Sequence, residues 1–280
     1  MKKKIRQSWN VARYETKLTV LSSKFVLLSV LSFIVMSFSA DPVRRFAAEY
    51  GVALSPGILP FYLADARYGN IMFFFLILLF SDMPMKQKGQ NQVLQRCGLG
   101  CFGMGQLLSM AAVSLVFVVE QILFSILVCI PDLTFRGWGK VWGSIVDNIF
   151  YEAGYTVSFA VPAAVLRDYT LPEALLQSAL TFFLTGVCYG LFIFLLNGVC
   201  KNRVGVSVMA VWSVCWIFLR VWPGKVTEKV MRFAPQSLND LSLHGKGYGR
   251  VAVVLLLAAI MVLTIADYVL IKKRKLSLVK

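Results

Sequence analysis

Cysteine and histidine are the side chains from which a metal or redox centre would be built, and this sequence spaces them poorly for one. Its six cysteines lie in or beside apolar segments, and the only histidine is His244. Cys97 and Cys101 are separated by three residues, but no second pair or nearby histidine completes a zinc site. We therefore predict free thiols and no metal site.

Glycines at residues 98–103, GLGCFG, match the pattern G-x-G-x-x-G. A dinucleotide-binding turn follows a strand within a βαβ unit, whereas here a polar, glutamine-rich stretch precedes the glycines and an apolar segment follows. Small residues that let helices pack closely are the better interpretation. The phosphate-binding pattern G-x-x-x-x-G-K-[ST] does not occur, so we predict that this chain itself binds no nucleotide and no other cofactor.

Hydrolysis within a membrane would need H-E-x-x-H, paired acids with histidines, or a lysine deep in an apolar segment. The sequence contains none of these. We therefore predict no catalytic residues and no enzymatic activity in this chain.

Three polar side chains stand inside long apolar segments: Glu120, Gln121 and Asp267. An ionisable group at membrane depth is costly and marks a candidate functional residue. Glu120, with Gln121 beside it, could line a substrate path or a proton relay, or could hold helices together by a hydrogen bond. Asp267 lies about one turn before Lys272, which suggests that it reaches the membrane surface or pairs with the basic residues there.

The elements that carry these residues are predicted from composition. Apolar residues make up 58% of the 280 residues and charged residues only 15%, and the mean hydropathy is +0.70. A soluble domain has about a quarter charged residues. We predict an all-α, polytopic integral membrane protein.

Six segments are apolar enough to cross a hydrocarbon core of about 30 Å, which takes about 20 helical residues. They are, approximately, residues 20–40, 60–82, 103–130, 174–199, 204–222 and 250–271. The first could be a signal peptide, but its long basic leader and the five later segments favour a retained helix. We predict one six-helix transmembrane domain over residues 20–271, between a segment 1–19 and a basic tail 272–280.

The positive charge lies mostly on one side of these spans. The side with both termini carries 17 of the 29 Lys and Arg residues and only two acids, Glu15 and Asp82. Cytoplasmic loops carry the excess of Lys and Arg, so both termini are predicted to be cytoplasmic, and the net charge of +15 indicates anionic lipid rather than nucleic acid as a partner.

Two long external loops follow from this topology, at residues 131–172 and 223–249. The first is apolar, but Asp147 and Glu152 oppose full insertion, so a re-entrant or interfacial element is expected. The second is polar, and Arg220 before it reads as an interfacial anchor. At the other end, Val11, Tyr14 and Leu18 have helical spacing, which is compatible with an interfacial helix or with a disordered basic tail.

Residues 82–98 connect the second and third spans. Asp82 ends an apolar stretch, Pro84 redirects the chain, and a polar, basic segment follows. Val93, Leu94 and Cys97 would form a small apolar face on a helix from about 90 to 97, which could dock on a cytoplasmic partner, although an ordinary loop is equally compatible with the spacing.

This arrangement resembles the permease subunits of ABC transporters of the ABC-2 kind. The resemblance rests on six spans, an interfacial N-terminal helix, the acid-x-proline exit, and Leu94, Arg96, Gly98 and Gly105 leading into the third span. It implies that residues 82–98 form a coupling helix, with Asp82, Pro84, Val93, Leu94, Arg96 and Gly98 at the contact with a separate ATPase subunit, which binds ATP and Mg²⁺. One feature departs from the family: its well-known exporters have their large external element between the fifth and sixth spans, whereas the longest loop here follows the third.

The resemblance also implies a second permease copy or a related permease as partner, alternating access, export, and a place in the bacterial plasma membrane. A secondary transporter or channel remains an alternative, since Gly186 and Gly190 could interrupt the fourth span. An intramembrane enzyme is the least favoured reading.

Overall fold

The computed structural model describes residues 2–84, 90–200, 203–221, 233–243, 245 and 247–273. Of these residues, 79% are helical and none forms a strand, so the predicted all-α class is confirmed. Four helices are long and apolar enough to cross a membrane: α2 (Ser23–Glu49), α6 (Leu99–Val128), α10 (Leu171–Cys200) and α13 (Tyr248–Lys273). In lipid, a helix satisfies its own backbone hydrogen bonds, which is why such apolar stretches become helices.

The second predicted span, 60–82, is not one continuous helix. It consists of α3 (Ile58–Ala64) and α4 (Ala66–Leu79), which meet at an angle of 96° and raise the number of candidate spans to five if the pair is counted as one. Asp65 causes the break, since its carboxylate accepts hydrogen bonds from the backbone N–H groups of Arg67 and Tyr68. This is an N-cap that starts a new helix where the apolar pattern alone predicts continuation.

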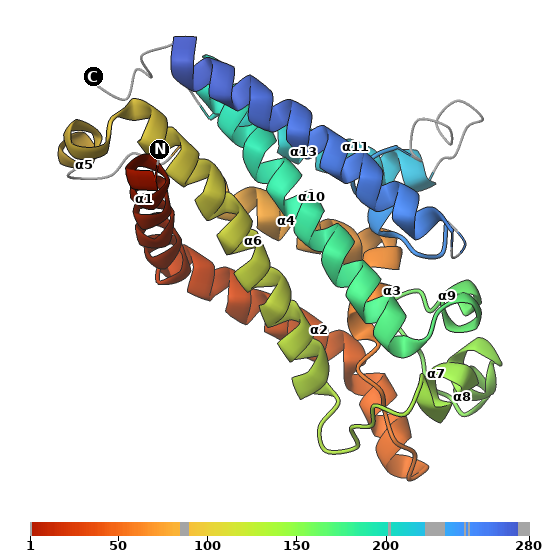
Figure 1. Ribbon diagram of the computed structural model, residues 1–280. Coiled ribbons are helices and arrows are strands. Elements are labelled where there is room, and N and C mark those ends of the chain that lie inside the picture. Colours follow the sequence, from red (N-terminus) through yellow and green to blue (C-terminus); the bar gives the residue numbers. More distant parts are fainter. Residues whose placement is uncertain are drawn as a thin grey trace.

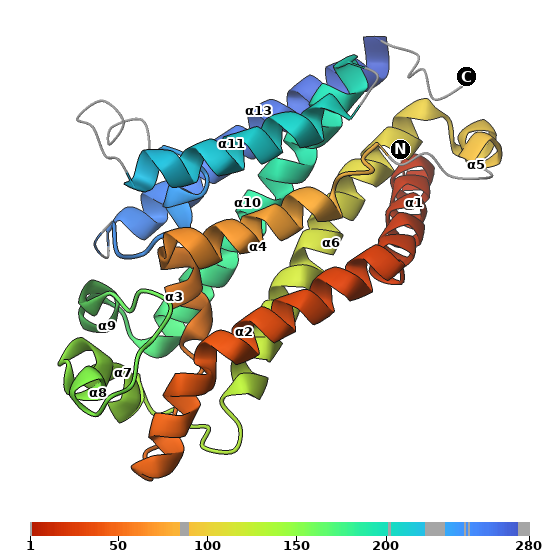
Figure 2. The ribbon, with the colours of Figure 1, turned by 180° about the vertical axis from the view of Figure 1, so that it is seen from behind.

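A sixth apolar helix, α11 (Val204–Val221), is shorter than the others. It lies beside α10 and α4, and Figures 1 and 2 show these helices running between the same two ends of the molecule. The first end carries the start of α1 (Lys2–Val20), the short helix α5 (Gln90–Cys97) and the last turn of α13, and we call it the terminal end.

The opposite end, which we call the distal end, is covered by the connection between α6 and α10. It folds into α7 (Gly139–Val146), α8 (Ile149–Glu152) and α9 (Ala163–Asp168), none long enough to cross a membrane. The buried Trp142 donates its indole N–H to the carbonyl of Ser55 at 3.0 Å and fixes this layer to the loop before α3. Residues 131–170 therefore contain no helix long enough to add a span.

The N-terminal segment is helical, and it is not a loose tail. One face of α1 is buried against α6, with Ser8, Val11, Ala12, Glu15 and Thr19 at helical spacing. Trp9 and Leu18 flank that face and stay exposed, while Arg6, Arg13 and Lys17 occupy the opposite side. The apolar residues named from the sequence thus divide between protein contact and surface.

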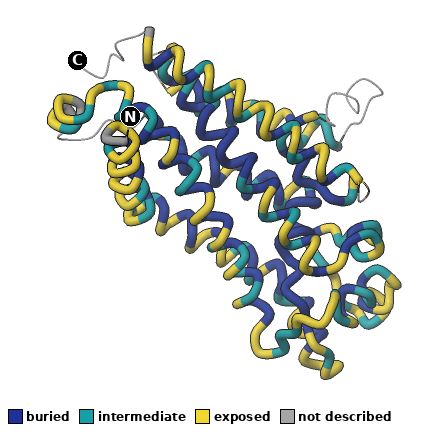
Figure 3. Tube along the Cα trace, in the orientation of Figure 1, coloured by how far each residue is buried: buried dark blue, intermediate teal, exposed yellow. Residues whose placement is uncertain are grey.

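The core lies around α10. Two-thirds of its most apolar 18-residue window (67%) is buried, against 22% for α13, and Figure 3 shows buried positions concentrated on the inner helices. Phe73, Phe117 and Phe182 meet here from α4, α6 and α10. From its central position α10 packs against α4, α6, α11 and α13.

Candidate functional site

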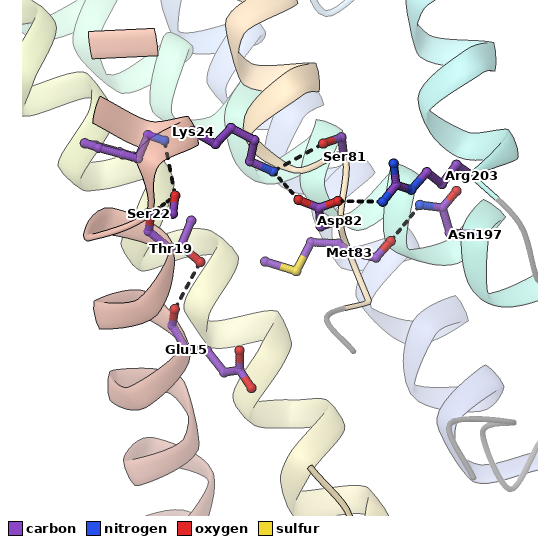
Figure 4. Close-up of polar contacts among 10 residues, drawn as sticks. Glu15, Thr19, Ser22, Lys24, Ser81, Asp82, Met83, Asn197 and Arg203 are labelled. Carbon is purple, nitrogen blue, oxygen red and sulfur yellow. Dashed lines mark hydrogen bonds and ion pairs between the residues drawn. The ribbon is translucent and has the colours of Figure 1, made fainter. Parts of the chain in front are cut away.

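At the terminal end, ion pairs and hydrogen bonds from other side chains hold Asp82 and Met83, which follow α4 (Figure 4). Asp82 pairs with Lys24 of α2 at 2.6 Å and with Arg203, just before α11, at 3.1 Å. Both pairs are partly exposed, so each stabilises the fold by roughly 0–1 kcal/mol. Their importance is geometric, because one carboxylate joins three helices.

Asn197, near the end of α10, strengthens the same junction. Its side-chain amide donates to the carbonyl of Met83 at 2.6 Å and accepts from the N–H of Gly205 at 2.8 Å. Gly205 lies so close to α10 that an added Cβ would be 2.8 Å from the carbonyl oxygen of Ile193. The chain leaving α4 is therefore attached to α2, α10 and α11 together.

The predicted coupling segment divides into parts. Pro84 lies at the end of the first described stretch, residues 85–89 and the side chain of Leu94 fall outside the described residues, and Arg96 is exposed on α5. Figures 1 and 2 show α5 beyond the start of α6 and close to α1. Gly98 separates α5 from α6 with a φ of 76°, a conformation that glycine adopts at little cost.

Asp267 is placed differently from the sequence-based expectation. Its side chain is fully buried, and neither carboxylate oxygen has a hydrogen-bond partner within the described part of the chain. The reason is the packing of the next turn, where Leu270 lies against Gly198 and Ile271 against Gly103. That contact turns this face of α13 toward α6 and α10 and away from Lys272, which is exposed.

Glu120 and Gln121 face α2. The hydroxyl of Ser32 donates to Oε1 of Gln121 at 2.5 Å, and Ser29 interacts with the carboxyl group of Glu120. Gln121 is fully buried, whereas Glu120 is half-buried. The structure thus brings both predicted residues to the α2–α6 contact but separates them from Asp267.

The contact between α6 and α10 contains buried polar groups, of which the sequence analysis singled out only Gln121. Three contacts define the antiparallel register: Gly186 lies on Ser114, Gly190 on Met110, and the Phe117 ring is 6.2 Å from that of Phe182. These pairs show that a residue of α6 lies opposite the residue of α10 whose number is about 300 minus its own. By the same register, Gln121 of α6 lies at the level of Ser178 of α10, and Ser114 lies within about a turn of Tyr189.

These four residues carry buried atoms that find no hydrogen-bond partner among the described residues. The atoms are Oγ of Ser114, Nε2 of Gln121, Oγ of Ser178 and the hydroxyl of Tyr189, and all four residues are at most 2% exposed. We call Ser114, Gln121, Ser178 and Tyr189 the polar track. An unpaired polar group in an apolar interior costs free energy, so a row of them calls for an explanation.

A second buried polar structure attaches residues 233–243 to the distal half of the bundle. Three side chains at i, i+4 and i+8 on α11 hold it: Trp212 donates to Gln236, Trp216 donates to Ser237, and Arg220 pairs with Asp240. Asn239 donates to Thr185, halfway along α10. The polar loop expected from sequence therefore inserts between helices through the 3₁₀ turn η1 (Ser237–Asn239), and Arg220 is a partner of buried Asp240 instead of a surface anchor.

Comparison with protein families and curated proteins gives no further guide to this site. No protein-family model and no curated protein matches the sequence. Within the described residues, no three or more His, Cys, Asp or Glu side chains come together as a metal site would require. The chemistry that the described arrangement supports is hydrogen bonding inside a helical bundle and an ion-paired junction at its terminal end.

Proposed function

We propose that this chain is the membrane-spanning permease subunit of an ATP-binding cassette transporter of the ABC-2 kind, with six crossings and both termini in the cytoplasm. The observation that carries the proposal is the set of contacts at the end of α4, in which Asp82 pairs with Lys24 and Arg203. We call it the Asp82 junction. The only connection between α4 and α6 includes α5 and begins at a carboxylate that is joined to α2 and α11, with α10 attached beside it. α5 itself packs against α6 and α1, so a force on α5 would act directly on those two helices.

The count of six treats α3 with α4 as one bent crossing and includes α11. At 1.5 Å per residue, the 18 residues of α11 extend about 27 Å, close to the thickness of the hydrocarbon core. An even number of crossings agrees with α1 beginning and α13 finishing at the same end (Figure 1). Lys24, Arg96 and Arg203 at that end support a cytoplasmic position.

The exposed apolar surface supports insertion in lipid, and we place the chain in the bacterial plasma membrane. Large apolar side chains are exposed along α2 and α13, among them Phe38, Val254 and Met261. Lipid would cover such faces, and a second permease copy would cover part of them. Export is the direction that the family resemblance favours.

Transport is driven, in this proposal, by a separate ATPase subunit that holds ATP and Mg²⁺ and docks at α5. Residues 233–243, the main described part of the segment between α11 and α13, are held against α11 by hydrogen bonds and an ion pair. The departure from the family that the sequence shows, a longer loop after the third crossing, is unaffected by this attachment.

A secondary transporter is the second candidate, and the broken α3–α4 pair favours it, since such proteins bind substrates at the ends of interrupted helices. However, the N-terminus of α4 is already occupied. The carboxylate of Asp65 accepts from the N–H groups of Arg67 and Tyr68 and from that of Ala160 at 2.9 Å. The N–H groups of Arg67 and Tyr68 at the N-terminus of α4 therefore need no anionic group of a substrate as their acceptor.

The test is purification from the native membrane in mild detergent, followed by measurement of vanadate-sensitive Mg-ATP hydrolysis by the complex. The unaltered chain should bring ATPase activity with it, and Arg96→Glu, alone or with Leu94→Glu, should remove most of it. Arg136→Glu, an exposed substitution at the distal end, is the matched control and should keep the activity. Retention of the full activity by Arg96→Glu with Leu94→Glu would show that α5 is not the docking element.

A further inference from the structure

The polar track differs from ordinary polar packing between membrane helices. Serine and threonine in a helix usually return their hydroxyl to the carbonyl three or four residues earlier. Ser29, Ser109 and Thr181 do so here, at 2.9, 2.7 and 3.0 Å. Ser114 and Ser178 do not, although they lie on the same helices as Ser109 and Thr181.

Direct bonding between helices does not explain the track either. Polar residues that hold helices together bond across the contact, as Ser32 and Gln121 Oε1 do between α2 and α6. The other end of the same amide, Nε2 of Gln121, has no such partner. The amide of Gln121 is therefore half bonded: its oxygen accepts a hydrogen bond from α2, and its nitrogen has no acceptor among the described residues.

We propose that the polar track binds uncharged hydrogen-bonding groups of the transported molecule, namely hydroxyl or amide groups, and excludes ions. The inference rests on the proposed function and names the chemical class that the permease would carry along α6 and α10. Three hydroxyls, which each donate and accept, and one amide N–H, which donates, match groups of that class.

The absence of charge along the track supports neutrality. None of its four side chains carries a charge at neutral pH. Two carboxyl groups with buried oxygen atoms lie near the track but are not part of it: Glu120, next to Gln121 on α6, and Asp267 on α13. Arg220 is already paired with Asp240. An ion placed among the four track side chains themselves would lose its hydration without an opposite charge from any of them, which is strongly unfavourable.

Cysteine accessibility provides the test. Ser114→Cys and Ser178→Cys, each nearly isosteric, are made singly in a chain whose six native cysteines are replaced by alanine. Native membrane vesicles, with and without Mg-ATP, are treated with three methanethiosulfonates that differ only in their heads: 2-hydroxyethyl, 2-sulfonatoethyl and 2-trimethylammonioethyl. Ser109→Cys and Thr181→Cys are matched controls, because both positions are fully buried on the same two helices but have bonded hydroxyls.

We expect the neutral reagent to modify both track positions at least tenfold faster than the controls, and about 100-fold faster than either charged reagent, the ratio that a charge at helix centre implies. Failure of all reagents in both conditions would show dry packing and overturn the proposal. Equal rates with charged reagents would show an ion-accessible path and overturn its neutrality, while equal rates at the controls would show entry through lipid. None of these outcomes affects the ATPase measurement with Arg96, so the two proposals fail separately.

Discussion

Replacement of Arg220 by methionine tests the attachment of residues 233–243. Asp240 is fully buried, the side chain of Arg220 is 20% exposed, and the same guanidinium also donates to the carbonyl of Ala64 at 2.8 Å. Arg220→Met leaves the carboxylate buried, and the donors that remain to it in the described part of the chain are the N–H and hydroxyl of Ser242. Breaking a buried pair in this way costs about 3–5 kcal/mol.

The assay is the free energy of unfolding in mixed detergent micelles, measured for a double-variant cycle. The single variants Arg220→Met and Asp240→Leu should each be strongly destabilised, and the double variant should recover most of the loss because no charge is left unpaired. Arg203→Met is the control, since it removes an exposed partner of Asp82 and should cost only about 0–1 kcal/mol. Equal effects of Arg220→Met and Arg203→Met would refute the burial argument.

Three smaller perturbations follow from local geometry. Gly205→Ala should destabilise by about 1–3 kcal/mol in the same assay because its Cβ meets backbone, whereas Gly100→Ala, which meets nothing within 4 Å, should be neutral or slightly stabilising. Gly98→Ala should cost about 1–3 kcal/mol, because its φ of 76° with a ψ of 158° is a conformation essentially restricted to glycine, and it should lower the ATPase activity recovered with the chain. Burial raises the pKa of Glu15 to about 7 from 4.5, so between these pH values the folded protein keeps a proton that the unfolded chain releases. The free energy of unfolding should therefore fall as the pH rises from about 4.5 to about 7. Glu15→Gln should remove this dependence on pH.

The sequence predicted the helical class because a helix is the structure that satisfies backbone groups within long apolar segments. It singled out the polar positions Glu120 and Gln121, but at residues 90–97 its spacing was equally compatible with a helix and with an ordinary loop, and the structure shows the helix α5. It failed at Asp65, where apolar residues on both sides concealed an N-cap. The cap became recognisable only when Ala160 and Arg67 were seen around the carboxylate.

The polar track illustrates a second limit of sequence reasoning. Ser114 and Ser178 look like the small residues found in any membrane helix, and nothing in the local sequence separates them from Ser109 or Thr181. The difference is whether the hydroxyl returns to its own backbone. That choice depends on how the neighbouring helix packs, here through Gly186 against Ser114.

Composition and periodicity alone therefore determined that this chain is helical, that its apolar segments suit a membrane, and on which side of those segments Lys and Arg are concentrated. Each of these depends only on the polarity of side chains and backbone groups within one segment. The tertiary structure decided which polar groups are paired. Ser213 meets Asn70 across 143 residues and Arg220 meets Ala64 across 156. Such pairings depend on the register of packed helices, and the register follows from the fit of side chains between them.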